Sequence, residues 1–499
     1  MKRKNTGLIL KIICVLQILF GSVAFFAAKW YVDTYGDTGF DSILFTLFSN
    51  LSGVENDLII SYLLKSLLPA VILAALVSFI LLWDPKNVRI EIFKSRNGGF
   101  RVFPCPEFLK IACSFILCVC LIFVGSFKVD LPNWAISKLN NSEIYEKDYV
   151  KPTSQTVTFP ENKRNLIYIF LESMETTYLS KEYGGAETDN LIPNLQKLAE
   201  ENTNFSHTNG VGGWGNVTNT TWTVASLVAQ TAGVPLNISE NNYTDNNKFM
   251  SGITTINDVL HDNGYYQAIM FGSDASFGNR DKYFSTHSVD DIFDLFSARK
   301  DKIIPEDYYV WWGMEDKYLF EYAKQKLNVM SKSDKPFAFS LLTVDTHHIG
   351  GYVCSECTNE HKNQYENVIA CSDRQVSDFV KWIKEQDFYK NTTIVLCGDH
   401  RSMDAEYFEK NISSDYDRHI YNCFINSAVE TTNTKNRILT PMDMFPTTLA
   451  ALGCTLKNNR LAMGVNLFSK NFTLAEIYGA ENFNAELKKT SKYYEKNFS

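Results

Sequence analysis

The chain has 499 residues, a formal net charge of −8, and 45% hydrophobic and 14% aromatic residues. This composition is too apolar and too aromatic for a disordered chain. The negative net charge, and the absence of a basic stripe with interleaved aromatic residues, argue against a nucleic-acid-binding protein. The length allows one large domain, or two to three domains of roughly 100–200 residues each.

Three apolar runs in the first quarter of the chain predict a membrane anchor. Each is free of charged residues and, with its flanks, approaches the roughly 20 residues that a membrane-spanning helix needs. We therefore expect residues 1–128 to form a three-helix transmembrane anchor, with spans at about 10–30, 64–83 and 109–127. The three runs are Ile12–Ala28, Ser66–Trp83 and Ile111–Phe127.

Basic residues beside these runs predict the orientation of the anchor, because short cytoplasmic loops carry an excess of Lys and Arg. They are Lys2, Arg3 and Lys4 at the N-terminus, and Lys86, Arg89, Lys94, Arg96 and Arg101 between the second and third runs. Acidic residues dominate the loop between the first two runs. We expect a multi-pass plasma-membrane protein with a cytoplasmic N-terminus and everything after Phe127 outside. The apolar stretch Ile43–Val54 is too short to span and is expected at the outer membrane interface.

After Lys128 the pattern becomes that of a soluble domain. Residues 129–161 are polar and read as a linker, residues 162–470 alternate short apolar runs with helical stretches, and residues 471–499 form a polar, partly helical tail. This alternation predicts an α/β domain with a mostly parallel sheet and helices on both faces. The expected strands are Leu166–Leu171, Tyr266–Phe271, Phe337–Val344 and Thr393–Cys397. The expected helices are Ile192–Glu201, Thr254–Asn263, Asp316–Ser331, Cys371–Glu385 and Pro441–Leu452.

Three cysteines of this domain form a pattern of their own. Cys354 and Cys357 are spaced like a pair of zinc ligands, and Cys371 follows, but a fourth ligand at a suitable spacing is missing. A disulfide between Cys371 and one of the pair is the favoured interpretation, because an extracytoplasmic domain lies in an oxidising compartment. The sequence does not decide which pair is joined.

Polar residues follow four of the expected strands, at the edge of an open α/β sheet where ligands bind. They are Glu172; Asn279 and Arg280; His347 and His348; and Asp399 with His400. Carboxylates with imidazole suit Mn²⁺ or Zn²⁺, and arginine is a forked donor for phosphate. Together they indicate metal-assisted phosphoryl or sulfuryl transfer.

A nucleophile for this reaction is expected in the hydroxyl-rich segment Gly215–Ser226. It runs into a helical stretch, Val224–Gln230. A hydroxyl at a helix start lies beside free N–H groups and the positive end of the helix dipole, and both favour a phosphate. Any single threonine here would also serve as an ordinary helix cap, but the whole cluster is better explained by chemistry.

These residues, in this order, resemble the outward-facing phosphoglycerol transferases of the alkaline phosphatase/sulfatase superfamily, which include lipoteichoic acid synthases. The resemblance covers residues 162–468. It rests on Leu171-Glu172-Ser173, Ile192–Ala199, Thr221-Trp222-Thr223, Asp345–His348, Gly398-Asp399-His400, Asp443–Leu449 and Met463–Phe468. The resemblance implies an alkaline phosphatase-like fold and one divalent metal. The oxygen-rich ligands with one His favour Mn²⁺ over Zn²⁺ or Mg²⁺, although they do not fix the metal.

The resemblance also assigns residue roles. It implies that Glu172, Thr223, Asp399 and His400 hold the metal, with Thr223 also the nucleophile and Thr221 the alternative. His347 is the implied substrate-side histidine, with a proton-transfer role, and His348, Asn279 and Arg280 the implied substrate-binding residues. We therefore expect transfer of glycerophosphate from phosphatidylglycerol, through a phospho-threonine, to a hydroxyl of an envelope glycan or a polyglycerophosphate chain.

Two departures limit what the resemblance implies. Lipoteichoic acid synthases have a tryptophan where this chain has Gly278, in Ser276–Arg280, which puts donor and acceptor details in doubt. The Cys/Ser-x-Pro-x-Arg motif of true sulfatases is absent, which argues against sulfate-ester hydrolysis. The alternatives are a phosphoethanolamine transferase of the same superfamily and a non-catalytic membrane protein that binds envelope glycans.

Overall fold

The computed structural model describes residues 2–36, 38–48, 56–83, 107–238, 248–311 and 313–498. The chain divides into two compact units, residues 1–37 with 55–133, and residues 38–54 with 134–499. The basic loop from Lys86 to Arg101, on which the predicted orientation depends, lies outside the described residues, as do residues 49–54 of the expected interface stretch.

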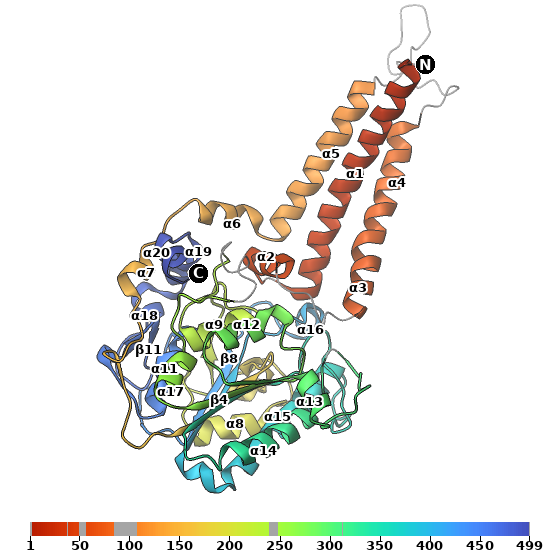
Figure 1. The fold of residues 1–499 in the computed structure, drawn as a ribbon. Helices are drawn as coiled ribbons and strands as arrows, with labels where there is room; N and C mark the ends of the chain where they lie inside the picture. The colour runs from red at the N-terminus through yellow and green to blue at the C-terminus, as the bar shows by residue number, and fades with distance from the viewer. Residues whose placement is uncertain are drawn as a thin grey trace, which may run out of the picture. The chain divides into compact units, whose positions relative to one another are not determined.

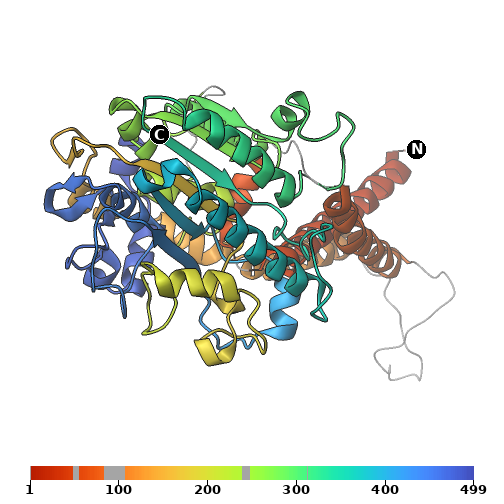
Figure 2. The ribbon, with the colours of Figure 1, turned by 90° about the horizontal axis from the view of Figure 1, so that it is seen from below.

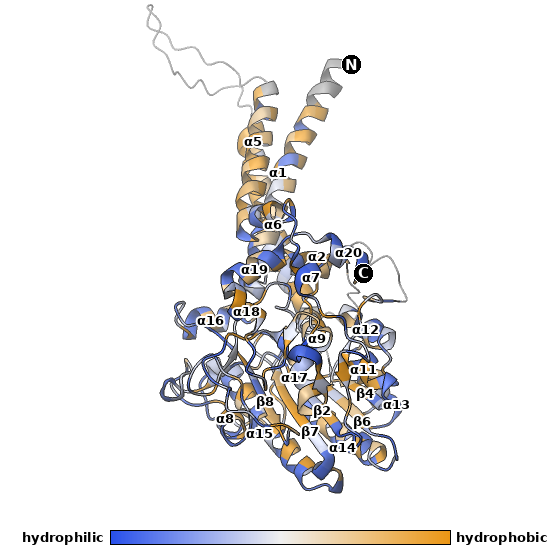
Figure 3. Ribbon diagram, turned by 90° about the vertical axis from the view of Figure 1, so that its left-hand side faces the viewer, coloured by the Kyte–Doolittle hydropathy of each residue, from blue (hydrophilic) through white to orange (hydrophobic). Residues whose placement is uncertain are grey.

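The first unit contains three helices that are long and apolar enough to cross a membrane, over Leu8–Tyr35, Leu58–Leu82 and Leu109–Lys128. Figure 3 shows α1 and α5 coloured mostly as hydrophobic. All three coincide with the apolar runs of the sequence. The elements are α1 (Lys2–Tyr35), α3 (Asn56–Tyr62), a π-helical turn (Leu63–Leu67), α4 (Leu68–Leu82) and α5 (Glu107–Lys128).

Helix α1 packs against both α4 and α5. A Cβ at Gly21 would lie 2.8 Å from the Cα of Cys118, and a Cβ at Gly125 would lie 3.2 Å from the Cα of Phe25. Glycine therefore lets the two backbones approach, as small residues do between membrane helices. The Ser114 hydroxyl also donates to Gln17 Oε1 across this interface at 2.6 Å.

The second unit is built on a seven-stranded sheet of order β3-β8-β7-β2-β6-β4-β5. The five strands from β7 to β5 are parallel, whereas β8 is antiparallel to β7, and β3 to β8. The predicted α/β fold with a mostly parallel sheet is confirmed. The strands are β2 (Asn165–Leu171), β3 (Gly213–Trp214), β4 (Tyr266–Phe271), β5 (Asp291–Phe293), β6 (Phe337–Leu342), β7 (Thr392–Gly398) and β8 (Ile420–Ile425).

Helices cover both faces of this sheet, as Figures 1 and 2 show. Side chains of a strand alternate between faces, so that in β2 Tyr168 and Phe170 enter one core and Ile167 and Ile169 the other. The first core is closed by α9 (Thr223–Ala232), α11 (Ile256–Asp262), α12 (Arg280–Thr286) and α17 (Met444–Ala451). The second is closed by α8 (Pro193–Glu201), α13 (Leu295–Lys300), α14 (Asp316–Met330), α15 (Gln364–Lys384) and α16 (Ala405–Asn411).

Some elements differ from the sequence expectation. Helix α15 begins at Gln364 rather than at Cys371, because Asn363 and Glu366 form a capping box at its start. Strand β8 was not expected, and it is buried along its whole length. Two small antiparallel sheets complete the domain, β1 (Val157–Thr158) with β9 (Thr455–Leu456), and β10 (Arg460–Leu461) with β11 (Gly464–Val465).

Segments outside the predicted catalytic core also pack on it. The stretch read as a linker contains α6 (Leu131–Lys138) and α7 (Ile144–Asp148), and the tail contains α18 (Leu474–Tyr478), α19 (Ala480–Lys488) and α20 (Lys492–Asn497). The rings of Tyr145 and Tyr494 meet at 5.2 Å between centroids, within the first core. Helix α2 (Phe40–Phe48) joins the same core through Phe45, whose ring lies 5.6 Å from that of Trp222.

The disulfide expected among Cys354, Cys357 and Cys371 is not formed. All three are free thiols. Cys354 Sγ lies 3.7 Å from Cys357 Sγ and 3.8 Å from Cys371 Sγ, well beyond the S–S bond length of about 2.05 Å. The three sulfurs nevertheless converge.

Candidate active site

Three predicted metal ligands meet where two neighbouring parallel strands end. Glu172 follows β2, and Asp399 and His400 follow β7. His400 Nε2 lies 3.3 Å from Asp399 Oδ2 and 3.6 Å from Glu172 Oε1. One ligand atom from each residue lies within 4.8 Å of the others, and all three residues are buried. This is the spacing of groups that share one metal ion.

Thr223 is the first residue of α9, and its hydroxyl lies 3.2 Å from His400 Nε2. Trp222 before it is extended and serves as the N-cap residue, so Thr223 lies in the first turn, where backbone N–H groups are free to bind an anion. The alternative nucleophile points elsewhere: the Thr221 hydroxyl donates to the backbone oxygen of Thr38 at 2.9 Å. We call Glu172, Asp399 and His400 the carboxylate–histidine group. The geometry thus brings Thr223, and not Thr221, to this group.

Neighbouring groups hold the three predicted ligands in place. The backbone N–H of Ser173 donates to Asp399 Oδ1 at 2.8 Å, and that of His400 donates to the same oxygen at 2.7 Å. The Ser173 hydroxyl donates to Glu172 Oε1 at 2.8 Å. His400 Nδ1 lies 2.8 Å from the Arg401 carbonyl oxygen. Because a carbonyl only accepts, Nδ1 carries the proton and Nε2 keeps its lone pair for a metal.

A bound cation would stabilise the ionised carboxylates of Glu172 and Asp399. Burial, and then the negative charge of Asp399, raise the pKa of Glu172 well above its ordinary value. Asp399 Oδ2 is buried and accepts no hydrogen bond from the described residues. Two carboxylates, one imidazole lone pair and one hydroxyl form a donor set that fits a divalent ion such as Mn²⁺ or Zn²⁺. The residues present therefore fit the implied metal, although they do not decide its identity.

Arg280 brings a buried positive charge to the same region. It is 1% exposed, its guanidinium lies 4.7 Å from the ring centroid of Phe271, and Nη2 donates to Ser273 Oγ at 2.8 Å. Burial lowers the pKa of Arg280 to about 10, and the charge of Glu172 opposes this shift. The side chain therefore stays protonated at neutral pH. Asn279, next to it, is also buried and has a positive φ of 59°.

The two predicted histidines lie together after β6. Their rings stack with centroids 4.3 Å apart, and His347 Nδ1 lies 2.8 Å from the His348 carbonyl oxygen. Nδ1 is therefore the N–H donor, and Nε2 of His347 carries the lone pair. Burial, and then the proximity of His348, lower the pKa of His347 well below its ordinary value. Burial likewise lowers the pKa of His348 to about 3. Both imidazoles are neutral at pH 7.

Two supporting residues received no role from the sequence. Ser173, besides its bonds to Glu172 and Asp399, adopts a positive φ of 54° that turns the chain under the site. Ser226, one turn after Thr223 on α9, donates its hydroxyl to the backbone oxygen of Asp399. Its spacing from Thr223 on one helix face was a usable signal, but the sequence did not show which strand end this helix packs against.

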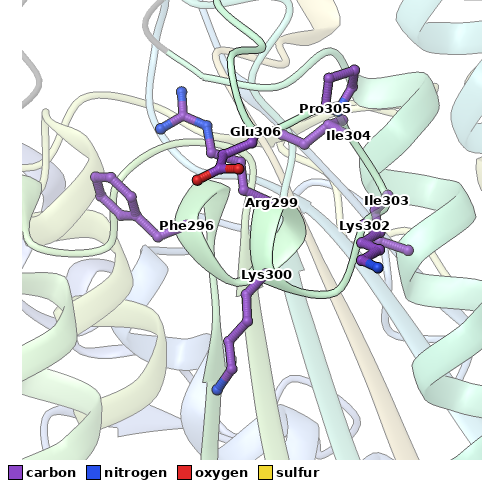
Figure 4. A pocket seen from close by; sticks show the side chains of 8 residues that line it. All are labelled: Phe296, Arg299, Lys300, Lys302, Ile303, Ile304, Pro305 and Glu306. Carbon is purple, nitrogen blue, oxygen red and sulfur yellow. The ribbon is translucent and has the colours of Figure 1, made fainter.

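A separate cavity of about 940 Å³ lies beside α13 and the residues that follow it. Arg299, Lys300 and Lys302 line it together with Phe296 and Glu306 (Figure 4). None of the residues of the carboxylate–histidine group lines this cavity. The chemistry described above therefore lies elsewhere in the domain.

Comparison with known proteins shows the family to which the chain belongs and the relatives to which it is similar. The profile of the family described as Sulfatase matches residues 164–454. A curated relative, phosphoglycerol transferase I from Xanthomonas axonopodis pv. citri, is 30% identical over 337 residues, which cover 63% of this chain and 43% of that protein. The chain thus spans less than half the length of the curated relatives it matches.

Solved structures share the fold at lower identity. An alkaline phosphatase superfamily protein from Vibrio parahaemolyticus is 23% identical with a TM-score of 0.50, covering 64% of this chain and 73% of that one. The lipoteichoic acid synthase LtaP from Listeria monocytogenes is 19% identical with a TM-score of 0.50, covering 65% and 80%. At these identities the two structures support the alkaline phosphatase-like fold alone.

Proposed function

Because this chain belongs to the sulfatase family, we propose that it is a membrane-anchored phosphotransferase. It moves glycerophosphate from phosphatidylglycerol, through a phospho-threonine on Thr223, to a hydroxyl of an envelope glycan or a polyglycerophosphate chain. The observation that carries the proposal is the Thr223 hydroxyl, 3.2 Å from His400 Nε2 at the start of α9. The curated relatives named phosphoglycerol transferase I support the choice of the glycerophosphate group.

Glu172, Asp399 and His400, together with the Thr223 hydroxyl, are the residues that would hold the metal ion, which we propose is Mn²⁺ rather than Zn²⁺ or Mg²⁺. When bound, such an ion acts as a Lewis acid that lowers the pKa of a coordinated hydroxyl and offsets phosphoryl charge. The mainly oxygen donor set supports Mn²⁺.

In the first step, Thr223 Oγ1 attacks the phosphorus of the lipid. The Thr223 O–P bond forms, the P–O bond to diacylglycerol breaks, and the proton lost by Thr223 is balanced by the one that diacylglycerol gains. The positive charge of buried Arg280 offsets charge that develops on the phosphoryl oxygens. The free N–H groups in the first turn of α9 face the same charge.

In the second step, an acceptor hydroxyl replaces Thr223 at phosphorus. His347 is neutral, and its Nε2 lone pair can take the proton of the acceptor hydroxyl as the new O–P bond forms. Thr223 regains a proton as it leaves. We assign His348 and Asn279 to substrate binding beside His347 and Arg280, respectively.

The apolar helices of the first unit support a membrane location for this reaction. We propose a multi-pass plasma-membrane protein with a cytoplasmic N-terminus and an outward-facing catalytic domain. An anchored enzyme meets lipid head groups at a raised effective concentration. The donor and the enzyme then share one surface, while the acceptor arrives from outside.

Trapping the covalent intermediate tests the proposed function. The full chain in detergent micelles, supplied with Mn²⁺ and phosphatidylglycerol without an acceptor, is expected to gain the mass of one glycerophosphate. Intact-mass spectrometry measures the adduct, and peptide mapping places it on Thr223. A phosphoethanolamine adduct, formed only with phosphatidylethanolamine, would transfer the assignment to a phosphoethanolamine transferase. No adduct from either lipid would contradict the mechanism and favour a glycan-binding role.

His347→Gln should separate the two steps. We expect the Thr223 adduct still to form, whereas its transfer to an acceptor slows roughly a hundredfold, the scale of one lost general base. Rapid-quench measurement of adduct formation and decay checks this. His261→Gln, which changes an exposed histidine of α11, is the matched control and should leave both rates unchanged.

The pH dependence of transfer follows from the same histidine. The neutral imidazole is the active form, and the pKa of His347 is lowered well below its ordinary value by burial. The neutral imidazole is therefore already the main form at pH 6.5 and above. It is lost only as the pH falls through the lowered pKa of His347. A pH–rate profile of adduct decay with a midpoint near 6.5 would contradict the assignment.

A further inference from the structure

Three cysteine sulfurs converge between the loop that follows β6 and the helix that follows this loop. Cys354 and Cys357 lie in the loop, and Cys371 lies on α15. Cys354 Sγ is 3.7 Å from Cys357 Sγ and 3.8 Å from Cys371 Sγ, and all three sulfurs lie within 4.8 Å of one another. We call these three residues the thiol cluster.

The spacing of the sulfurs matches a tetrahedral metal site. A zinc–thiolate bond is about 2.3 Å long, which gives a tetrahedron edge of about 3.8 Å between two sulfurs. A disulfide instead brings one pair of sulfurs to about 2.05 Å and leaves the third cysteine outside. In the thiol cluster Cys354 is equally close to both other sulfurs, as in the arrangement around a shared ion.

A glutamine amide faces the thiol cluster. Gln375 lies one turn after Cys371 on α15, and its Nε2 is 3.3 Å from Cys371 Sγ and 3.7 Å from Cys354 Sγ. Its Oε1 is buried and has no hydrogen-bond partner among the described residues. The two ends of an amide are assigned from their partners. Rotating the Gln375 amide by 180° exchanges Oε1 and Nε2. The unsatisfied oxygen then points toward the sulfurs, where it can bind a metal ion that they share.

Two cations lie beside the thiol cluster, and one of its cysteines is partly exposed. Lys317 Nζ donates to Ser355 Oγ at 2.7 Å, and Arg374 Nη2 donates to the Glu356 backbone oxygen at 3.0 Å, which places both cations beside the turn between Cys354 and Cys357. Three thiolates around a divalent ion carry one net negative charge. Lys317 also pairs with Glu315 at 2.9 Å, whereas Arg374 donates to backbone oxygens and its charge can offset that of the thiolates. Cys354 and Cys371 are buried, whereas Cys357 is partly exposed and leaves an entry path for an ion.

We propose that Cys354, Cys357 and Cys371 bind a zinc ion as thiolates, with the Gln375 amide on the fourth side. Each cysteine releases one proton to solvent when it binds the ion, and no oxidation takes place. The ion ties the loop after β6, which begins beside His347 and His348, to α15. The proposal does not depend on the transferase assignment, because the thiol cluster shares no residue with the carboxylate–histidine group.

Metal analysis of the purified full chain tests this proposal. After growth in zinc-containing medium and purification in detergent without chelator, zinc per chain is measured by elemental mass spectrometry. We expect Cys357→Ser and Cys371→Ser to contain about one zinc ion less per chain than the unchanged protein. Cys423→Ser, at a buried cysteine of β8 outside the cluster, is the matched control and should retain it. Equal zinc content in the unchanged protein and in all three variants, or copper in place of zinc, would overturn the proposal.

A second measurement needs no variant and therefore does not depend on how the variants fold. The metal of the unchanged protein is replaced by Co²⁺, and a thiolate-to-cobalt charge-transfer band in the near ultraviolet is expected, because only sulfur ligands produce it at this intensity. The protein is then unfolded with chelator, without reductant, and alkylated. All three cluster cysteines should be alkylated. A peptide lighter by two hydrogens that links two of them would show a disulfide and overturn the zinc site, as would the absence of the cobalt band.

Discussion

Replacing Thr223 with alanine should lower transfer of glycerophosphate by roughly a thousandfold or more, the scale at which removal of a nucleophile is usually felt. The reason is geometric: the Thr223 hydroxyl lies 3.2 Å from His400 Nε2, and the variant has no oxygen there to attack phosphorus. The adduct with phosphatidylglycerol should disappear as well. Initial transfer rates and the intact mass of the full chain in lipid micelles measure both effects.

Two variants make this test specific. Thr221→Ala removes a hydroxyl that is engaged with the Thr38 backbone oxygen at 2.9 Å, so it should retain the adduct and most of the activity. Thr223→Ser keeps an attacking oxygen and should retain measurable transfer. Intact transfer in Thr223→Ala together with its loss in Thr221→Ala would reverse the assignment of the nucleophile.

Removing the metal should abolish transfer and lower the thermal stability of the domain. Burial, and then the charge of Asp399, raise the pKa of Glu172 well above its ordinary value, so the ionised form of Glu172 is unfavourable in the metal-free site. A bound Mn²⁺ stabilises this ionised form. At a hundred times the dissociation constant, the ion should stabilise the folded state by about 2.7 kcal/mol. Melting curves of the full chain, with and without added Mn²⁺, measure the shift.

Asp399→Asn should remove the Mn²⁺-dependent shift without destabilising the metal-free protein. An amide oxygen can still accept the N–H groups of Ser173 and His400, and the amide nitrogen lacks the charge that repels Glu172. Asp378→Asn, at an exposed carboxylate of α15, is the matched control. Mn²⁺ suits this comparison because it prefers oxygen to thiolate ligands and leaves the thiol cluster aside. A full Mn²⁺ shift in Asp399→Asn would contradict the ligand assignment.

The contribution of this site to the pH dependence of stability should reverse sign when the metal is removed. For Glu172 the folded-state pKa is raised, so the metal-free fold loses stability as pH rises from the ordinary pKa of a glutamate through this raised value. The metal-bound fold behaves in the opposite way, because protons compete with the ion as pH falls. Melting temperatures from acidic to neutral pH, with Mn²⁺ or with chelator, separate the two slopes.

Much of the architecture was predictable from local patterns. The three charge-free apolar runs predicted the long helices of the first unit, because a run of that length has few other stable environments. The strands β2, β4, β6 and β7 were predicted from short apolar runs, and the sheet was predicted as mostly parallel. The residues after them were predicted to lie near one another because parallel strands end at one edge of a sheet.

Other features depended on contacts between distant residues. Strand β8 carries Asn422 and Cys423 within its apolar run, a mixed composition that did not stand out as a strand, and its burial comes from pairing with β7 and packing against α8. In the tail, Phe483 and Tyr494 are buried in the first core, although their segment reads as polar. Amphipathic short helices of this kind acquire their buried face only from the surface they meet.

The sequence by itself determined the class of fold, the apolar helices and the set of residues that could perform metal-assisted transfer, because these follow from periodicity, residue type and order along the chain. Only the tertiary structure distinguished Thr223 from Thr221 and showed three separate thiols where a disulfide was expected. Both outcomes depend on where side chains from different elements meet. Ser173 and Asp399, for example, are 226 residues apart and 2.8 Å from donor to acceptor. Distances of this kind arise from packing, which a single sequence does not encode in any local pattern.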